Sequence, residues 1–410
     1  MTIHRWRFSY LFSVIIFIFL FALVTIHCDL CVYKSGNTRS KIRNSFCAMM
    51  ISHIMKFFLS FFIFISITSL SFALSSEYSL SSHSNLDKFS SSDEQVLELF
   101  QLWKKEHGKE YENSEENAKR FETFRSNLKH INEMNAKRKS ATQHRLSLNK
   151  FADMSPEEFS KTYLQETPSK YGDRKLKDED DDDCDNLPAS VDWRKEGAVT
   201  EVKDQGNCQS HWAFAVVGTI EGFNKIVTGN LIELSAQELV DCDPASHGCA
   251  GGFYFNAFGW VINNGGIDTE ADYPYTAKNG TCKENANKAV SIDNLYVLDG
   301  SEEALLCQTS KQPVIVSLDA TGLQFYAGGV YGGENCKKDS RNANLVGVIV
   351  GYGSVNGEDY WIVKNSWGKD WGEKGYLFIK RNVIKEWPYG VCAINAAVGY
   401  PVKEALSSAM

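Results

Sequence analysis

The chain has no run of basic residues and very little histidine. It carries 43 Lys and Arg against 51 Asp and Glu, a formal net charge of −8. Without a basic block, the sequence offers no site for a nucleic-acid partner. The last of its 9 histidines is His247, so the chain beyond that point lacks an imidazole. Histidine is the commonest metal ligand and a common general base. We therefore expect neither a metal cluster nor a cofactor.

Cysteine, by contrast, is plentiful. The chain of 410 residues has room for more than one domain and contains 11 cysteines. Cys28, Cys31 and Cys47 lie near the N-terminus, and the others all lie from Cys184 onward. Such cysteine usage favours an oxidising compartment, such as the secretory pathway.

Two uncharged apolar runs, 9–26 and 57–74, lie near the N-terminus. The second resembles a secretory signal peptide at 55–73, with Lys56 before the apolar core and small residues at its end. We expect Met55 to be the true start and 1–54 to be an untranslated upstream extension. The alternative is a membrane anchor running from Ser9 to Ile26.

The pattern turns helical from Asp93. Six residues then recur at spacings of three or four, which places them on one face of a helix. They are Glu116, Arg120, Phe124, Asn127, Ile131 and Asn135. Asn149, Phe151 and Asp153 follow at intervals of two. This spacing predicts an amphipathic helix followed by a second short motif.

Residues 156–185 contain an acidic run at 178–183, and we interpret them as a solvated linker that also suits processing. The region beyond, 186–410, begins with helical patterns. In it, Ser210 is a good N-cap residue and Gly229 a helix-ending residue. Its later part is rich in strand patterns, at 313–318, 346–350, 360–363 and 375–379. Helices followed by strands predict an α+β protein.

One stretch in the helical part carries the clearest motif. It runs Asp204-Gln205-Gly206-Asn207-Cys208-Gln209-Ser210-His211-Trp212-Ala213-Phe214-Ala215. It resembles the active-site signature of papain-like cysteine proteases, in which a cysteine stands at the position of His211. The six-residue helical pattern is similar to that of the papain-type inhibitory prosegment, here at 94–155. The chain most resembles the plant vacuolar and seed thiol-protease-like group.

The resemblance implies a papain-like fold of two subdomains, preceded by the helical inhibitory prosegment. A helical half at about 186–299 faces an antiparallel barrel-like sheet at 300–400, with a cleft between them. It also implies the disulfides Cys208–Cys249, Cys242–Cys282 and Cys336–Cys392, with Cys184–Cys307 as a fourth. The composition does not decide whether Cys184 and Cys307 form this bridge or remain two free thiols.

The resemblance also assigns roles in the reaction centre. His211 stands at the nucleophile position and Leu345 at the base position, whereas Asn365 matches the orienting residue and Gln205 the oxyanion-hole residue. Leucine cannot move a proton. A helix N-terminus disfavours an imidazolium, so we expect a neutral ring at His211. We therefore expect catalysis to be lost.

The same cleft contains the residues implied in substrate binding. Gly251, Gly252 and Phe253 would offer backbone and an apolar wall to a peptide. Gln209 and Val346 replace small residues and add bulk where a substrate backbone would lie.

Three hypotheses follow. The first is a non-proteolytic papain-like protein, secreted or vacuolar, that binds a peptide or protein ligand in the cleft or serves in storage or defence. The second is an active cysteine endopeptidase, if His211 and Leu345 are sequence errors. The third is an inhibitor or receptor component that acts through the prosegment. In each, the prosegment is an internal partner, the protein is expected to be a monomer, and Asn279 is a glycosylation site.

Overall fold

The computed structural model describes residues 93–165, 184–283, 288–298, 300–338, 343–383 and 385–403. The expected signal peptide at 55–73, the apolar run at 9–26 and the acidic run at 178–183 lie outside the described residues. Within the described ranges, every helix is too short or too polar to cross a membrane.

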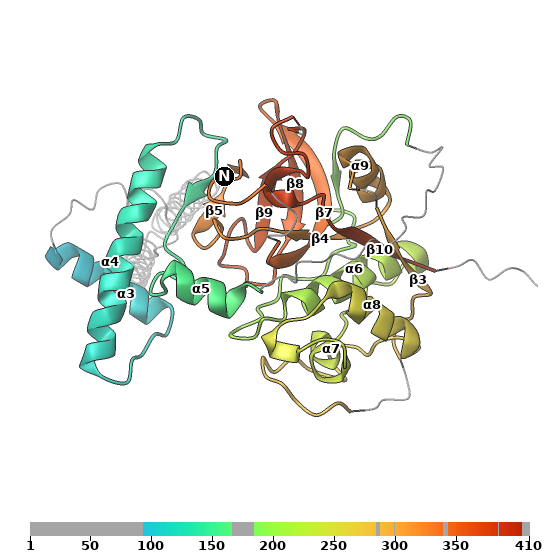
Figure 1. The fold of residues 1–410 in the computed structure, drawn as a ribbon, viewed down its shortest axis with the longest axis horizontal. Coiled ribbons are helices and arrows are strands. Elements are labelled where there is room, and N and C mark those ends of the chain that lie inside the picture. Colours follow the sequence, from blue (N-terminus) through green and yellow to red (C-terminus); the bar gives the residue numbers. More distant parts are fainter. Residues whose placement is uncertain are drawn as a thin grey trace, which may run out of the picture. The chain divides into compact units, whose positions relative to one another are not determined.

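The prosegment consists of three helices and one short strand (Figure 1). They are α3 (Asp93–Glu106), α4 (Ser114–Ala136), β1 (Arg145–Leu146) and α5 (Pro156–Tyr163). The predicted motif helix is confirmed as α4, which begins where the Asn113 side chain accepts a hydrogen bond from the Glu116 N–H. Phe124, Asn127 and Ile131 are buried on its inner face.

The linker prediction was wrong over residues 156–165. These residues form α5 and a buried tail of two residues, Leu164 and Gln165. Ser155 caps α5 and Glu158 returns the bond to the Ser155 backbone, so the two make a complete capping box with Pro156 at the first helical position. This strong helix start was hidden in a segment whose overall composition is acidic and polar.

The helical half contains α6 (His211–Thr228), α7 (Ala236–Cys242) and α8 (Tyr254–Asn263). As predicted, α6 ends at Gly229, whose φ of 80° is a left-handed conformation that glycine adopts without strain. Ser210 occupies the N-cap position of α6, as predicted, but its side chain makes no capping bond. The Ser210 hydroxyl instead lies 2.6 Å from the Tyr275 hydroxyl.

The second half is built on a sheet with the strand order β3-β10-β4-β7-β8-β9-β6. Its strands are β3 (Asn294–Val297), β4 (Val314–Leu318), β6 (Val330–Tyr331), β7 (Leu345–Val355), β8 (Glu358–Lys364), β9 (Tyr376–Lys380) and β10 (Val398–Val402). The short β2 (Val191–Asp192) pairs with β7, so the start of the 186–410 region joins the sheet. One helix, α9 (Glu302–Lys311), also belongs to this half. The predicted α+β class is confirmed.

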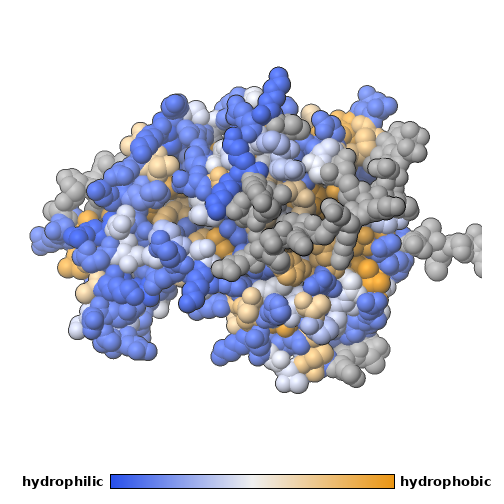
Figure 2. Space-filling view, in the orientation of Figure 1, coloured by the Kyte–Doolittle hydropathy of each residue, from blue (hydrophilic) through white to orange (hydrophobic). Residues whose placement is uncertain are grey.

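The prosegment extends the sheet half through a small second sheet. β1 pairs antiparallel with β5 (Tyr326–Gly328), and the His144 N–H donates to the Val330 carbonyl at 3.1 Å. On the face shown in Figure 2, the surface over α3 and α4 is mainly hydrophilic. The larger apolar side chains of these helices, such as Phe100, Trp103 and Phe124, are buried. Addition of a strand gives main-chain hydrogen bonds that do not depend on side-chain identity.

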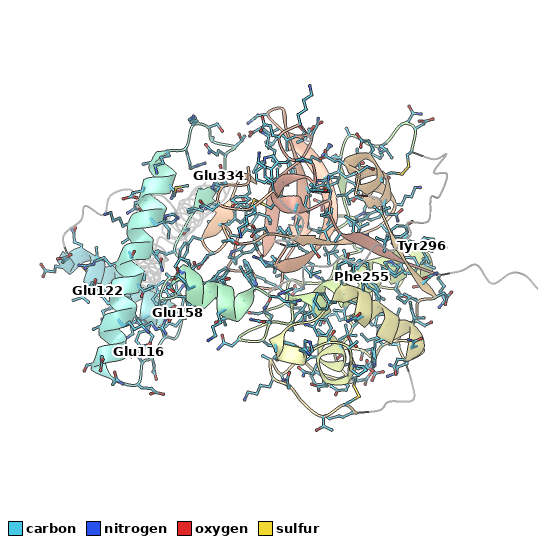
Figure 3. All side chains as sticks on the ribbon, viewed as in Figure 1. Glu116, Glu122, Glu158, Phe255, Tyr296 and Glu334 are labelled. Atoms are coloured by element: carbon cyan, nitrogen blue, oxygen red, sulfur yellow. A yellow bond between two sulfur atoms is a disulfide. The ribbon has the colours of Figure 1, made fainter. Side chains whose placement is uncertain are left out.

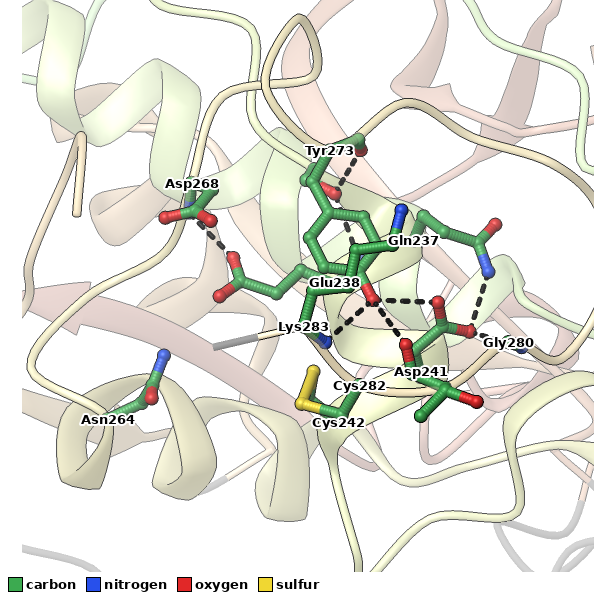
Figure 4. The surroundings of a disulfide bond; sticks show 12 residues. Gln237, Glu238, Asp241, Cys242, Asn264, Asp268, Tyr273, Gly280, Cys282 and Lys283 are labelled. Carbon is green, nitrogen blue, oxygen red and sulfur yellow. Dashed lines mark hydrogen bonds between the residues drawn. A yellow bond between two sulfur atoms is a disulfide. The ribbon is translucent and has the colours of Figure 1, made fainter. Parts of the chain in front are cut away.

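Four disulfides join the pairs that the resemblance implied. They are Cys184–Cys307, Cys208–Cys249, Cys242–Cys282 and Cys336–Cys392. Figure 4 shows the surroundings of Cys242–Cys282, where Asp241 accepts hydrogen bonds from the Tyr273 hydroxyl at 2.8 Å and the Gly280 N–H at 2.7 Å. These bonds hold the loop that carries Asn279.

Candidate functional site

His211 is the first residue of α6 and lies at the junction of the two halves. Its side chain is 1% exposed. The Val346 N–H, near the start of β7, donates a hydrogen bond to His211 Nδ1 at 3.2 Å. The imidazole therefore bridges the helical half and the sheet half.

This contact fixes the state of the ring. Since Nδ1 accepts a hydrogen bond, the proton of the neutral ring lies on Nε2. Nε2 is buried and has no hydrogen-bond partner among the described residues. Burial lowers the pKa of His211 to about 3, so the ring is neutral at any ordinary pH. The neutral ring was expected, but the cause here is desolvation.

Leu345 and Asn365 lie on neighbouring strand ends and cannot exchange a proton. Leu345, the first residue of β7, is 3% exposed and belongs to the apolar core of the sheet half. Asn365 follows β8, and its side-chain oxygen accepts from the Ser366 N–H at 2.8 Å. Asn365 Nδ2 is buried without a partner in the described part of the chain. Asn365 and His211 line the same small pocket, and the Leu345 side chain has no atom that could accept a hydrogen bond from Asn365.

Gln205 is fully buried below the same cleft. Its Nε2 donates to the Cys208 carbonyl at 2.8 Å, and its Oε1 accepts from the Ser366 hydroxyl at 2.8 Å. The Tyr275 hydroxyl donates to the Gln205 carbonyl at 2.8 Å. These bonds hold the amide rigidly at the N-terminal end of α6.

Above this centre, the cleft contains the end of the prosegment. The Gln165 N–H donates to the Asn344 carbonyl at 2.9 Å, and the Gly252 N–H donates to Gln165 Oε1 at 2.9 Å. Gln209 Nε2 donates to the Lys161 carbonyl at 2.5 Å. A Cβ at residue 252 would lie 2.5 Å from the Trp212 ring, so only glycine fits there. Phe253 and Gly251 line the adjoining groove of about 1180 Å³.

Aromatic side chains anchor the prosegment at one side of the cleft. The rings of Phe151, Phe159 and Tyr163 surround Trp367, with ring centroids 5.1 to 6.4 Å from that of the indole. Lys150 also forms an ion pair with Asp204. Edge-to-face aromatic pairs each contribute about 0.5–1.5 kcal/mol beyond the area they bury.

The six-residue motif of α4 supports this anchor from behind. Arg120 bonds Glu116 at 2.6 Å and Glu158 of α5 at 2.9 Å, and both acids are labelled in Figure 3. Asn127 Nδ2 donates to the carbonyls of Ala152 and Met154, each at 2.9 Å. The motif therefore fixes the chain between α4 and α5.

Sequence reasoning missed Gln165 and its neighbour Leu164, which occupy the cleft directly. The capping box at Ser155 and Glu158 was the available signal, because it predicts a helix that would deliver the following residues toward the cleft. Among the described residues, no group of three or more His, Cys, Asp or Glu side chains is placed to hold a metal ion.

Comparison with known proteins agrees with this geometry. Residues 187–402 match the model of the papain family cysteine protease, and residues 100–159 match the cathepsin propeptide inhibitor domain (I29). The chain is 47% identical over 350 residues to the P34 probable thiol protease of Glycine max, covering 81% of this chain and 91% of that protein. It is 46% identical over 344 residues to the cysteine protease XCP2 of Arabidopsis thaliana, covering 82% and 94% respectively.

Solved structures of precursors are also similar. The recombinant stem bromelain precursor superposes with a TM-score of 0.70 at 37% identity, covering 76% of this chain and 99% of that one. The proform of the Amb a 11 cysteine protease, a ragweed pollen allergen, gives a TM-score of 0.69 at 37% identity, covering 78% and 96%. With its propeptide domain and its two-part fold, the chain belongs to the papain family of cysteine proteases.

Proposed function

We propose that this protein is a papain-family member that no longer cleaves peptides and acts instead by binding. The observation that carries the proposal is the state of the reaction centre. His211 is neutral, buried and hydrogen-bonded to the Val346 backbone, and Leu345 occupies the position expected for the base.

The chemistry of peptide cleavage requires a nucleophile and a group that takes and returns a proton. The His211 ring accepts at Nδ1 from a backbone N–H that it cannot deprotonate, and Nε2 has no hydrogen-bond partner among the described residues. Leu345 has no ionisable atom. Asn365 and Gln205 can orient and stabilise, but neither transfers a proton under these conditions.

The described residues contain no free thiol that could replace the missing nucleophile. Every cysteine of the described residues is part of a disulfide, including Cys208, which lies three positions before His211. Ser210 is fully buried, and its hydroxyl is engaged with Tyr275, which is not a base at neutral pH because burial raises the pKa of Tyr275 to about 12.

An active-site thiol probe tests this directly. We expect an electrophilic peptide probe to leave the trimmed protein unlabelled, because no cysteine is free near Gln205. Labelling that maps to position 211 would show that the true residue there is a cysteine. It would replace this proposal with that of an active cysteine endopeptidase.

For the binding role, the cleft itself is the candidate surface. Gly252 offers a backbone N–H and Asn344 a carbonyl, which an extended peptide or protein segment can pair with. In this structure both are used by Gln165, which favours the prosegment as the internal ligand. A role as inhibitor or receptor component through the prosegment remains the second candidate, supported by the match to the I29 domain.

We further propose that the protein enters the secretory pathway through residues 55–73 and reaches a vacuole or the extracellular space. Asn279 is exposed, as glycan attachment requires. Its Oδ1 accepts from the Cys249 N–H at 2.7 Å, which leaves Nδ2 for the glycan. A mass shift at Asn279 that disappears on Thr281→Ala tests the modification.

Maturation would then depend on a different protease. Asp185-Asn186 suits an asparagine-specific one, and Asn186 is exposed with a φ of 77°. Purified precursor held in acid is expected to stay uncut, whereas spontaneous trimming would contradict the proposal.

A further inference from the structure

We propose that residues 93–165 remain a permanent partner of the 184–403 region, and that the altered cleft is the seat that retains them after the chain is cut. We call Gln209, Gly252 and Asn344 the cleft seat. This inference rests on the proposed loss of proteolysis, because an active protease would digest its own bound prosegment.

Gln165 is held from both halves of the fold. The Gly252 N–H in the helical half donates to its side-chain oxygen, and the Asn344 carbonyl beside β7 accepts from its backbone N–H, both at 2.9 Å. The residue is 8% exposed, so these bonds form largely out of water. A buried acceptor or donor left unpaired costs about 1–3 kcal/mol, which penalises any departure of Gln165 that does not bring a replacement.

Gln209 satisfies the end of α5. The last carbonyls of a helix have no partner within the helix, and Lys161 provides one of them. Gln209 Nε2 donates to that carbonyl. Glycine, which the resemblance implies at this position, has no side chain to do so. The bulk that obstructs a substrate in the cleft therefore serves the prosegment.

With residues 93–165 docked, the floor of the cleft is covered. His211 is 1% exposed and Leu345 3%. The Val346 N–H, which could pair with a bound peptide, is already bound to the imidazole. The cleft seat offers two donors, Gln209 Nε2 and the Gly252 N–H, and one acceptor, the Asn344 carbonyl. Residues 161–165 supply the matching groups, because they end a helix and continue into the amide side chain of Gln165.

A second anchor lies outside the cleft and holds the same partner. Asn149 Nδ2 donates to the Gln324 carbonyl at 2.7 Å, and Gln324 Nε2 donates back to the Met154 carbonyl at 2.9 Å. Both side chains are buried, as are Phe151 and Trp367 beside them. Two separate anchors slow dissociation, because release of one leaves the other in place.

The position of Cys184 decides what a cut produces. A cut within 166–183 leaves the Cys184–Cys307 bond entirely in the later fragment, so only non-covalent contacts hold the prosegment. A cut after Asn186 leaves Cys184 on the prosegment fragment, which then stays attached to Cys307 through the disulfide. Either cut yields a two-chain particle.

The test places a recognition sequence for a site-specific protease within 166–183 of the full-length chain. After cutting, we expect both fragments to elute together in gel filtration at neutral pH. Gln165→Ala should speed dissociation of a labelled prosegment fragment roughly tenfold, as loss of about one buried hydrogen bond implies. Gln209→Gly should speed it by a smaller factor, because the bond from Gln209 to the Lys161 carbonyl is exposed. Gln101→Ala, at an exposed position of α3, is the matched control and should change nothing.

Two outcomes overturn the inference. One is separation of the fragments as soon as the chain is cut. The other is an unchanged dissociation rate in Gln209→Gly when circular dichroism shows the native fold. A parallel peptide-hydrolysis assay keeps the two proposals apart: fragments that separate without activity refute only the permanent partner, whereas hydrolysis refutes the proposed function itself.

Discussion

Polar side chains of the helix α4 and of the reaction centre are in opposite hydrogen-bonding states. In α4, Arg120 donates to the Asp153 carbonyl and to Glu158, and Asn127 donates to two further carbonyls, so both side chains join the helix to the chain beyond it. In the reaction centre, His211 Nε2 and Asn365 Nδ2 are buried with no partner among the described residues. Both regions belong to one scaffold with an intact core.

The difference in hydrogen bonding between α4 and the reaction centre distinguishes contacts that bind the prosegment from groups that would carry out catalysis. A buried polar group that lacks a partner costs free energy, whereas a fully paired one specifies a unique arrangement. On the prosegment side, Asn127 and Asn149 donate hydrogen bonds to carbonyls of the chain that they position. In the proposed reaction centre, Asn365 Nδ2 has no partner among the described residues, and the residue at the proposed base position is Leu345. Holding the prosegment is therefore the task that the intact contacts still serve.

The largest effect should come from restoring both altered side chains. We expect His211→Cys alone to give no measurable peptidase activity, because Leu345 leaves no base. His211→Cys with Leu345→His should raise kcat/KM at least roughly 10³-fold over the single variant, given the cost of removing one member of a triad. The assay uses trimmed protein and a generic peptide.

If the double variant stays inactive, Gln209→Gly and Val346→Ala should be added to clear the cleft. Full activity from His211→Cys alone would contradict the role given to Leu345, since the base would then have to be some other residue.

A smaller effect should distinguish two asparagines of similar burial. Asn127→Ala leaves the buried Ala152 carbonyl without a partner and removes one of the two bonds to the Met154 carbonyl, which Gln324 still pairs, so it should lower the free energy of unfolding by about 2–3 kcal/mol. Asn365→Ala removes only the bond to the Ser366 N–H and should cost about 1 kcal/mol. Urea unfolding measures the free energy of unfolding of each variant. Equal decreases in the two variants would contradict the proposed difference between the two asparagines.

A third prediction concerns acid and the prosegment strand. His144 is 5% exposed, packs edge-on against Tyr331 and lies 3.4 Å from Glu334. Burial lowers the pKa of His144 and the positive charge of Arg138 lowers it further, whereas the Glu334 carboxylate raises it. The docked state therefore favours the neutral ring.

The stabilisation of the docked prosegment by neutral His144 is complete above the free-histidine pKa of about 6.5. It is lost as the pH falls from there toward the lowered pKa of the docked His144. After the cut, prosegment dissociation should accelerate between pH 7.5 and pH 5. His144→Phe should flatten that dependence, and an identical pH profile in this variant would exclude the histidine as its source.

The smallest effect is spectroscopic. Because burial lowers the pKa of His211 to about 3, its ring signals should not titrate between pH 4.5 and 8, and its nitrogen shifts should report the Nε2–H form. Nuclear magnetic resonance of labelled histidine measures both. A midpoint near 6.5 would mean that the ring is open to water.

Much of the scaffold was predictable because periodicity is local. The spacing along α4 and the apolar strands β4, β7, β8 and β9 depend on neighbours in sequence. The family signatures then supplied the disulfide pairs. Ser210 lies at the predicted N-cap position of α6, but its hydroxyl pairs with the Tyr275 hydroxyl, 65 residues away in sequence, and makes no capping bond. No local pattern carries that information.

The occupied cleft could not be predicted for the same reason. Gln165 lies outside every signature, and its partners Gly252 and Asn344 come from different halves of the fold. The bond between His211 and the Val346 N–H likewise depends on how β7 meets α6 in space. The α5 capping box was readable, and a local inspection of residues 155–158 would have shortened the expected linker.

Hydrolysis of a generic peptide by the trimmed wild-type chain, with its residues at 211 and 345 verified by mass, tests the central claim most directly. We predict turnover indistinguishable from that of the buffer alone at every pH between 4 and 8. Turnover that disappears on His211→Ala would contradict the claim.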